Sequence, residues 1–354
     1  MKVFFESMGE KPFRSSQVMQ WMYHKKASSF EEMTNLSKSL RENLERHCRL
    51  SSLETVHTQF SQDGTRKYLL KLSDGKTIEA VYMPSEDRVT LCISTQVGCR
   101  MGCTFCLTAK QGLVRNLSTA EIINQVLEVQ KQVPIRISNI VMMGMGEPFD
   151  NLDSVIDVID ILHSTWGFNI SQRRITVSTV GLVPQILEFG KKTEVNLAIS
   201  LNASNDETRR TIMPINRKYA IDDLLAACRA FPLKPTRRIT FEYVMLEGIN
   251  NSLNHAQELV QKLQGIRCKI NLIPFNNHPL SPYQRPTDES IFAFQKYLID
   301  HHLTATIRYS RGQDILAACG QLVSADFLNR AIKNPSIPSE MGCVSNVPES
   351  FTKQ

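Results

Sequence analysis

Long apolar runs are absent from this 354-residue sequence, which contains no stretch close to the ~18 residues of a membrane-spanning helix. A secretory leader is not indicated either, because the opening MKVFFESMGEKPFR mixes acidic and basic residues where a leader needs continuous apolar ones. Nine cysteines are far fewer than a disulfide-stapled scaffold of this length contains. These absences argue against a membrane protein and a disulfide scaffold, and they predict a cytoplasmic location.

A strong excess of charge is also absent: 41 Lys and Arg residues stand against 35 Asp and Glu residues, a net charge of +6. So small an excess does not distinguish an RNA-binding enzyme from an ordinary basic one, although it permits a polyanionic partner where it is locally concentrated. The hydrophobic fraction of 42% is sufficient for a substantial core. In a reducing compartment, clustered cysteines indicate metal or redox chemistry rather than disulfides.

The chain is expected to begin with a small helical accessory domain over residues 1–75, because apolar residues recur there at helical spacing among charged ones. The segment KPFRSSQVMQWMYHKK also gathers basic and aromatic side chains, namely Lys11, Arg14, Trp21, Tyr23, Lys25 and Lys26. Such a helix is suited to contact with RNA phosphates and bases, but the same composition describes a charged face over an aromatic core. Composition leaves both interpretations open.

Strand–helix alternation predicts the main domain, over residues 76–322. Seven β-rich runs are expected to be strands: 89–94, 137–143, 174–178, 195–200, 239–245, 270–273 and 305–308. Between them lie helical segments such as 118–133, where Ser118 and Glu121 form a predicted capping box. About six such units predict an α/β fold with a partial (βα)6 barrel, whose chemistry lies at the carboxyl ends of the strands. The polar tail, residues 323–354, is expected to be partly disordered and its Cys343 incidental.

Three cysteines closely follow the first of these strands, in VGCRMGCTFCLTAKQG. Cys99, Cys103 and Cys106 have the spacing C-x3-C-x2-C. Thiolates are natural ligands of iron–sulfur clusters, and three of them leave one iron of a [4Fe-4S] cubane open to a substrate. A structural zinc site would need a fourth ligand, which is not apparent, and chance clustering fits poorly with so few cysteines. The sequence therefore predicts an iron–sulfur site.

Glycine and polar residues stand at the ends of several predicted strands. They are Gly146 and Glu147 after the second strand, Ser178 at the third, Ser200, Leu201 and Asn202 at the fourth, and Asn276 after the sixth. Each alone is more often a cap or a turn residue. Together, beside the cysteine loop, they predict a cofactor-binding wall in which the Glu147 carboxylate is suited to an ammonium group.

Two further cysteines are notable for their positions. Cys92 lies in the first strand, seven residues before the cluster motif, and Cys319 lies in SRGQDILAACGQL between Gly312 and Gly320. Lone cysteines of this kind are usually small buried hydrophobes. The closeness of Cys92 to the cluster motif, and the glycines on each side of Cys319, favour a functional role instead.

These motifs resemble those of the radical SAM superfamily, in which an aromatic residue, here Phe105, precedes the last cysteine of the motif. TLCISTQVGC, CTFCLTAKQGLVRNL, MGMGEP, IMPIN, NLIPFN and ATIRYSRGQDILAACGQL further resemble the RlmN/Cfr family of RNA methyltransferases. The resemblance runs from about residue 10 to residue 322. It implies a [4Fe-4S] cluster on the three cysteines and S-adenosylmethionine (SAM) held by the strand-end residues.

The resemblance also implies a reaction, the methylation of adenine C2 in 23S rRNA and tRNA. C2 is electron-poor and does not attack the methyl group of SAM, so a radical route supplied by the cofactor is required. By similarity, Cys319 accepts a methyl group from one SAM, and a radical made from a second SAM activates that methyl group. Cys92 then releases the product by forming a disulfide with Cys319. Glu79, in IEAVYMP, matches the family's proposed proton acceptor, although a strand carboxylate is ordinarily only solvated. A monomer served by an electron donor such as flavodoxin or ferredoxin, with no membrane partner, is expected.

One residue departs from the family pattern, because Ser-Leu-His reads Ser200, Leu201 and Asn202 here. An asparagine amide is still able to hydrogen-bond a ribose hydroxyl. Two alternative functions remain. A Cfr-type enzyme would use the same cysteines to methylate C8 of the same rRNA adenine, although Pro148 and the whole-chain likeness favour C2. A non-catalytic iron–sulfur RNA-binding or redox-sensing protein would not need Cys92 together with Cys319, so their joint presence favours catalysis.

Overall fold

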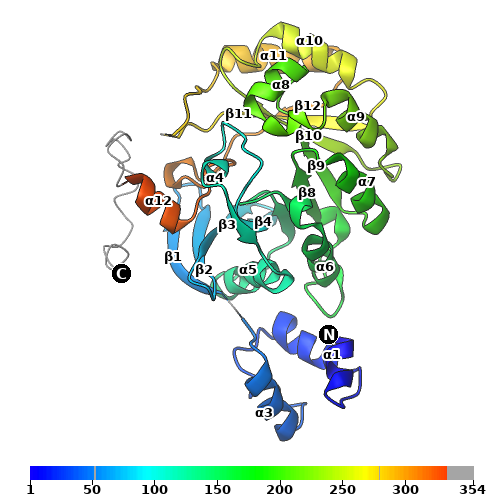
Figure 1. Cartoon of the computed structure of the whole chain (residues 1–354), viewed down its shortest axis with the longest axis vertical. Helices are drawn as coiled ribbons and strands as arrows, with labels where there is room; N and C mark the ends of the chain where they lie inside the picture. The colour runs from blue at the N-terminus through cyan, green and yellow to red at the C-terminus, as the bar shows by residue number, and fades with distance from the viewer. Residues whose placement is uncertain (52, 279, 333–354) are drawn as a thin grey trace.

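The computed structural model describes residues 1–51, 53–278 and 280–332, so most of the predicted tail, including Cys343, lies outside the described residues. The chain begins with a helical part at the lower end of the molecule (Figure 1). Its elements are α1 (Lys2–Ser7), α2 (Arg14–Met19), the π-helix η1 (Gln20–His24) and α3 (Lys38–His47). These helices enclose a small core of their own around Phe5, Met33, Leu40 and Leu44, separate from the main core.

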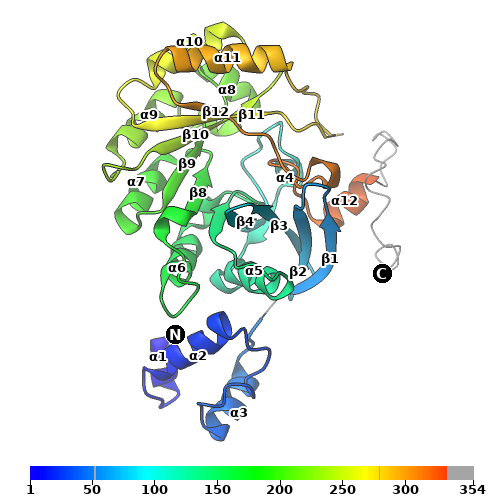
Figure 2. The same ribbon diagram turned by 180° about the vertical axis from the view of Figure 1, so that it is seen from behind.

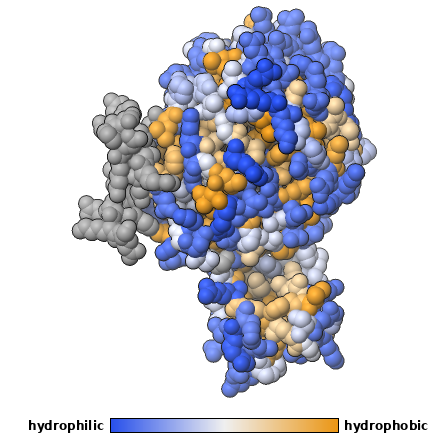
Figure 3. All heavy atoms as spheres, viewed as in Figure 1, coloured by the Kyte–Doolittle hydropathy of each residue, from blue (hydrophilic) through white to orange (hydrophobic). Residues whose placement is uncertain are grey.

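The basic and aromatic residues of this helical part divide between core and surface. Tyr23 is buried and packs against Phe168 of the main body, with ring centroids 5.1 Å apart. Lys25 is exposed and lies over the Trp21 ring, 3.6 Å from its centroid. Hydrophobic atoms are mixed with hydrophilic ones on the visible face of these helices (Figure 3). The aromatic-core interpretation therefore holds for Tyr23, while lysines remain at the surface.

An antiparallel meander connects the helical part to the main sheet. It consists of β1 (Glu54–Phe60), β2 (Arg66–Lys71) and β3 (Thr77–Ser85), and β3 pairs antiparallel with β4 (Arg88–Cys92). The sequence predicted a helical domain up to residue 75, whereas β1 and β2 already belong to the main sheet. Hydrogen bonding thus places the change from helical part to sheet near residue 51.

Seven parallel strands form the rest of this ten-stranded sheet within the described residues. After β4 they are β7 (Asn139–Met142), β8 (Ile175–Thr179), β9 (Asn196–Ser200), β10 (Ile239–Met245), β11 (Cys268–Pro274) and β12 (Ala305–Ile307). Each pairs in parallel with the next, so spatial order follows chain order. Every strand predicted from the β-rich runs is present, and the partial-barrel prediction is confirmed.

Helices connect consecutive parallel strands and cover the outer face of the sheet (Figure 2). They are α5 (Thr119–Gln132), α6 (Leu152–His163), α7 (Val183–Lys192), α8 (Asp206–Ile212), α9 (Ile221–Ala230), α10 (Leu253–Lys262) and α11 (Asp288–Asp300). Short 3-10 turns accompany them at η2 (Pro148–Asn151), η3 (Gln172–Arg174), η4 (Pro214–Arg217) and η5 (Gln313–Ile315). The predicted capping box is present: Ser118 Oγ accepts from Glu121 N, and Glu121 accepts from Ser118 N.

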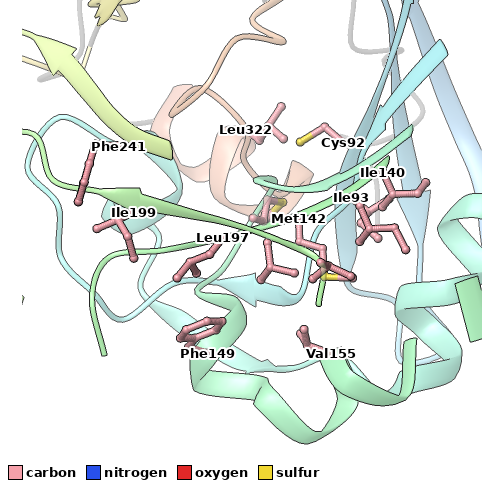
Figure 4. Close-up of a cluster of buried hydrophobic side chains, with 14 of the residues drawn as sticks. Cys92, Ile93, Ile140, Met142, Phe149, Val155, Leu197, Ile199, Phe241 and Leu322 are labelled. Atoms are coloured by element: carbon pink, nitrogen blue, oxygen red, sulfur yellow. The ribbon is translucent and has the colours of Figure 1, made fainter. Parts of the chain in front are cut away.

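The main core lies between these helices and the sheet. Figure 4 shows Phe149 and Val155 on the helix side of the strands, whereas Cys92 and Leu322 lie close together on the opposite side. Strand side chains alternate between these two sides, so one side packs against helices and the other faces the barrel interior. Within the described residues, no helix is both long and apolar enough to cross a membrane.

A small hairpin, β5 (Gln96–Gly98) and β6 (Leu113–Asn116), carries the cysteine motif between its strands together with α4 (Leu107–Lys110). Gly98 has a φ of +78°, and a Cβ at this position would lie 1.8 Å from the carbonyl oxygen of Gly112. Only glycine fits here, because both the left-handed backbone and the close approach exclude a side chain. This turn directs the cysteine loop towards the carboxyl ends of the parallel strands.

Candidate active site

Two adjoining cavities lie at the carboxyl ends of the parallel strands. The first, here called the cluster cavity, is lined by all three motif cysteines. Its other lining residues include Gly146, Glu147, Ser178, Ser200, Asn202, Glu242, Asn276, Arg308 and Cys319. The second, the cysteine-pair cavity, is lined by Cys92, Met143, Arg308 and Cys319 among others. Arg308 and Cys319 are therefore shared between the two cavities.

The cysteine loop is fixed by backbone hydrogen bonds. Cys99 N donates to Gly112 O at 2.9 Å, and Cys106 N donates to Cys103 O at 3.2 Å. From outside the motif, Leu107 N donates to Gly320 O at 2.7 Å and Thr104 N donates to Ile212 O at 3.0 Å. The loop is thus held by its own hairpin, by the segment that carries Cys319 and by α8.

Burial governs the ionisation of the three motif cysteines. It raises the pKa of Cys99 to about 12, and it raises the pKa of Cys103 and Cys106 as well. Cys99 and Cys106 further raise the pKa of Cys103, because thiolates close together repel one another. A cationic iron centre reverses this preference, since it stabilises the thiolate form of its ligands.

The arrangement of the three cysteines fits a multi-iron cluster. Within the described residues, no three Cys, His, Asp or Glu side chains are gathered tightly enough to be ligands of a single metal ion. A cubane cluster binds each cysteine at a different iron, so its ligands do not need to converge on one point. Cys99, Cys103 and Cys106 would hold such a cluster, and they line one cavity together with residues from the strand ends.

Glu147 lies at the wall of the cluster cavity but is already hydrogen-bonded. Its Oε1 accepts from Phe149 N at 3.0 Å, and its Oε2 accepts from Val180 N at 2.8 Å. Burial raises the pKa of this carboxyl to about 7, against the lowering effect of these donors. At Gly146, φ is +105° and a Cβ would lie 2.6 Å from Gln96 Cβ, so the backbone approaches the hairpin where a side chain has no room.

Asn202 is the residue at which the sequence departs from the family pattern. Its φ is +57°, in the left-handed region that asparagine adopts more readily than most residues. Both ends of its amide are used within the protein: Oδ1 accepts from Val244 N at 2.8 Å, and Nδ2 lies 3.2 Å from Met213 Sδ. The neighbouring Leu201 does not line either cavity, because its side chain is buried in the core.

The cysteine-pair cavity brings together residues that are 227 positions apart in the sequence, since both Cys92 and Cys319 line it. Both are free cysteines. Burial raises the pKa of Cys92 to about 12, and Cys319 adds to this rise while Arg308 opposes it. Cys319 in turn is the first cause that holds the pKa of Arg308 above its usual range, against the effect of burial. Arg308 is therefore placed to stabilise a thiolate at either cysteine.

Glu79, the predicted proton acceptor, lines neither cavity among those described. Its Oε1 pairs with Lys67 Nζ at 3.1 Å, and its Oε2 accepts from Val323 N at 2.8 Å. Lys67 Nζ also donates to Leu316 O at 3.2 Å, in the segment that leads to Cys319. Burial raises the pKa of Glu79, and Lys67 opposes the rise. The structure thus places Glu79 behind the Cys319 segment rather than on an open wall.

Comparison with known proteins shows the family. Residues 1–50 match the ribosomal RNA large subunit methyltransferase N-terminal domain, and residues 93–260 match the radical SAM superfamily. The dual-specificity RNA methyltransferase RlmN of Geotalea uraniireducens is 51% identical over 334 residues, which cover 94% of this chain and 96% of that protein. The RlmN of Geobacter sulfurreducens is 53% identical over 319 residues, 90% of this chain and 88% of that one. The chain belongs to the RlmN family.

A solved structure gives the same result for the fold of this RlmN-family chain. A radical SAM methyltransferase from Sphaerobacter thermophilus superposes with a TM-score of 0.87 at 43% identity, covering 91% of this chain and 96% of that one. The predicted family and fold are confirmed. As a radical SAM enzyme of the RlmN family, the chain uses a [4Fe-4S] cluster and SAM, and its substrate is RNA. The roles of the individual site residues stay predictions.

Three charged residues near the site were missed by the sequence analysis: the buried Arg209 and Glu242, and the partly buried Arg308. Arg308 lies within a motif that carried the family resemblance, and the other two lie in ordinary helix and strand sequence. The only signal available was a charged residue inside an otherwise apolar run, as in ITFEYVM around Glu242. Such residues are almost never fully buried unless paired or functional, so this signal was usable.

Arg209 is fully buried and joins the ends of β8 and β9. Its guanidinium donates to Leu201 O at 3.0 Å, Val180 O at 2.7 Å and Ser200 O at 3.2 Å, and to Asn216 Oδ1 at 3.0 Å. It also lowers the pKa of Cys103, while burial lowers the pKa of Arg209 itself to about 10. Arg209 therefore holds the strand ends in place and supplies positive charge near the cluster ligands.

Replacing Arg209 with alanine is expected to lower the free energy of unfolding by at least ~3 kcal/mol, because several buried carbonyls lose their donor. Its exposed neighbour on α8, Arg210, is the matched control, and Arg210→Ala is expected to change stability by less than about 0.5 kcal/mol. Urea unfolding followed by circular dichroism measures both. Similar midpoints for the two variants would show that the Arg209 hydrogen bonds contribute little.

Proposed function

We propose that this enzyme methylates C2 of adenine in 23S rRNA and in tRNA, through an S-methyl group carried by Cys319. The observation that carries the proposal is that Cys319 lines both cavities, the one with the cluster ligands and the one with Cys92. A methyl group on this sulfur would face the radical source on one side and the resolving cysteine on the other. The names of the relatives support the RNA substrates.

The cluster cavity is proposed to hold the cofactors. Bound there, the cluster and SAM supply a methyl cation equivalent in one step and a hydrogen-abstracting radical in another. Cys99, Cys103 and Cys106 hold the cluster, and Gly146, Glu147, Ser178, Ser200, Leu201, Asn202 and Asn276 are the proposed SAM-binding residues. Leu201 contributes through its backbone alone, since its side chain lies in the core.

Cys319 acts first as a nucleophile and must lose its proton to do so. Arg308 lines both cavities beside Cys319, and Asn276 Nδ2 donates to Cys319 O at 3.3 Å, which fixes the backbone of Cys319. The sulfur gains a methyl group and SAM loses one, leaving the demethylated thioether as product. After the methyl carbon has become bonded to C2, Cys319 links the enzyme covalently to RNA.

Cys92 then attacks the sulfur of Cys319. The new S–S bond forms as the bond from sulfur to the methylene carbon breaks, and that carbon takes a proton to become the methyl group of the product. The enzyme is left with a Cys92–Cys319 disulfide, which needs two electrons before another cycle. The electron donor is proposed to be a flavodoxin or a ferredoxin.

Glu79 is the proposed acceptor of the proton from C2. Its bonds to Lys67 and Val323 keep it apart from both cavities, so this role requires the contact with Val323 N to open when RNA binds. Burial raises the pKa of this carboxyl, which favours its uptake of a proton, and Lys67 opposes that rise. Lys67 contacts both Glu79 and Leu316 O. A movement of Glu79 would therefore be coupled to the segment that leads to Cys319.

RNA is proposed to enter through the cysteine-pair cavity. Arg88, Arg311 and Tyr309 line it and are exposed, a combination suited to phosphates and to stacking on a base. The helical part of residues 1–50 is proposed as a second RNA contact, with Lys11, Lys25 and Lys26 exposed on it. We also propose that the enzyme is a monomer and that it is located in the cytoplasm.

The test is product analysis on defined RNAs. Anaerobically reconstituted enzyme, reductant and SAM are incubated with 23S rRNA fragments and tRNA, and modified nucleosides are identified by mass spectrometry. We expect 2-methyladenosine in both RNAs. Appearance of 8-methyladenosine would identify a Cfr-type enzyme, and cleavage of SAM without any RNA product would refute the RNA assignment while leaving the radical SAM chemistry.

A further inference from the structure

Glu242 is a buried carboxylate whose two oxygens differ in their environment. It lies in β10 beside the end of β9 and the middle of β11, paired in register with Ser200 and Asn271. Only 6% of the residue is exposed, and it lines the cluster cavity. Oε1 accepts from Asn271 Nδ2 at 3.0 Å, whereas Oε2 is buried without a hydrogen-bond partner. A buried carboxylate oxygen without a donor is costly, so its presence at a cavity wall indicates a ligand donor.

Among the described residues, Arg308 is the only cation that forms an ion pair with Glu242 Oε2. This ion pair does not supply a hydrogen bond to the oxygen. Arg308 Nη1 lies 3.9 Å from Oε2, too far for a hydrogen bond. The pKa of this guanidinium is raised most by Cys319, next by Glu242 and least by Cys92, so its charge is shared among the three groups. The carboxylate therefore keeps acceptor capacity on the side that faces the cavity.

Asn202, two residues past the partner of Glu242 in β9, is already engaged at both ends of its amide, whereas Glu242 Oε2 has no hydrogen-bond partner. Its amide oxygen already accepts from Val244 N, and its amide nitrogen already contacts Met213 Sδ. Its backbone N also lies within 3.4 Å of Glu242 O, so the two residues are direct neighbours. Glu242 Oε2 is therefore a buried acceptor beside this strand end that has no hydrogen-bond partner.

We infer that Glu242, rather than Asn202, accepts a hydrogen bond from a ribose hydroxyl of bound SAM. The inference rests on the proposed SAM-binding role of the cluster cavity. SAM offers two other donors, its ammonium and the amino group of its adenine. The ammonium is the group to which Glu147, the strand-end carboxylate beside the cysteine loop, is suited, and the deoxy analogues in the test separate a ribose contact from an adenine contact. A ribose hydroxyl needs one acceptor with a free lone pair, which Oε2 provides.

The test measures SAM binding to anaerobically reconstituted enzyme without reductant, so that SAM is not cleaved. Equilibrium dialysis gives Kd for SAM and for its 2′-deoxy and 3′-deoxy analogues with wild type, Glu242→Gln and Asn202→Ala. Iron and sulfide content and thermal unfolding verify each variant. Glu121→Gln, which alters a buried carboxylate on α5 that lines neither cavity, is the matched control.

Glu242→Gln is expected to bind SAM about 10- to 100-fold more weakly, the effect of losing a hydrogen bond to a charged group. For one deoxy analogue, wild type and Glu242→Gln should have equal Kd values, because the hydroxyl that Glu242 contacts is missing. Asn202→Ala should still discriminate SAM from that analogue as wild type does, and Glu121→Gln should bind SAM normally.

Three results would overturn the inference. Glu242→Gln could bind SAM as wild type does, or it could lose affinity equally for SAM and both analogues, which would indicate an ammonium contact, an adenine contact or a general effect. Asn202→Ala could lose the discrimination, which would assign the hydroxyl to Asn202. The measurement on Asn202→Ala remains informative even if Glu242→Gln does not fold. Glu242→Asp is a second variant at position 242 that can be measured in its place. Since no RNA is present, failure of the proposed methylation would leave these results unaffected.

Discussion

In a Cys319→Ala variant, RNA methylation is expected to fall to the background while the cluster and its SAM-binding capacity remain. Cys319 does not belong to the C-x3-C-x2-C motif, and its side chain lies where the two cavities meet. Without its sulfur, no methyl group can be stored between the two uses of SAM. The reductive cleavage of SAM needs only the cluster cavity, so formation of 5′-deoxyadenosine should continue.

Three measurements on the same samples separate these steps: iron and sulfide content, 5′-deoxyadenosine by chromatography, and methylated nucleosides by mass spectrometry. Cys268→Ala is the matched control, because Cys268 is a buried cysteine on β11 that lines neither cavity. It should retain methylation. Methylated adenosine formed by Cys319→Ala would show that the methyl group travels directly from SAM to RNA, and the role given to Cys319 would be wrong.

Cys92→Ala is expected to stop the reaction one step later, with RNA covalently attached to Cys319. The alanine cannot attack the sulfur of Cys319, so the bond from sulfur to the transferred carbon persists. Free methylated RNA should fall to the background, and up to one RNA per enzyme should accumulate as an adduct. A denaturing gel with labelled RNA detects this adduct as a species that resists heat and detergent.

The double variant Cys92→Ala/Cys319→Ala supplies the control, since it lacks the attachment point and should give no adduct. Nuclease digestion followed by mass spectrometry of the peptides should place the residual nucleotide on Cys319 in Cys92→Ala. Normal amounts of free product from Cys92→Ala would mean that another group releases RNA, and the proposed disulfide would have no part in turnover.

The parallel strands were predictable because their residues are apolar on both faces. In β9 and β10, buried residues such as Leu197, Ile199 and Phe241 follow one another closely, as in a sheet covered by helices on one side and filled on the other. The meander β1 to β3 was harder to recognise. β1 is half-exposed throughout, and RKYLLK in β2 mixes charges with apolar residues in a pattern that is also compatible with a helix end.

The candidate site was predictable to the level of motif and cavity, but not to the level of side-chain direction. Leu201 follows Ser200 at the end of β9, and the alternation of a strand places its side chain in the core while its neighbour faces the cavity. Glu79 has the residue type of a proton acceptor, yet its ion pair with Lys67 depends on the antiparallel pairing of β2 with β3. The direction of the Leu201 side chain depends on where β9 ends, and the Glu79–Lys67 ion pair depends on which strands are neighbours. The residue types alone do not specify either feature.

The segment after Cys319 forms hydrogen bonds to the element that follows the cysteine motif. Gly320 O accepts from Leu107 N, and Leu322 O accepts from Thr108 Oγ1 at 2.5 Å. A shared set of bonds makes the two segments thermodynamically linked: any free energy that orders one also orders the other, in both directions and by the same amount. With the proposed roles of the motif cysteines and of Cys319, loading of the inorganic centre and positioning of the Cys319 sulfur would be coupled through these two bonds, so that incomplete metal loading would also loosen the nucleophile.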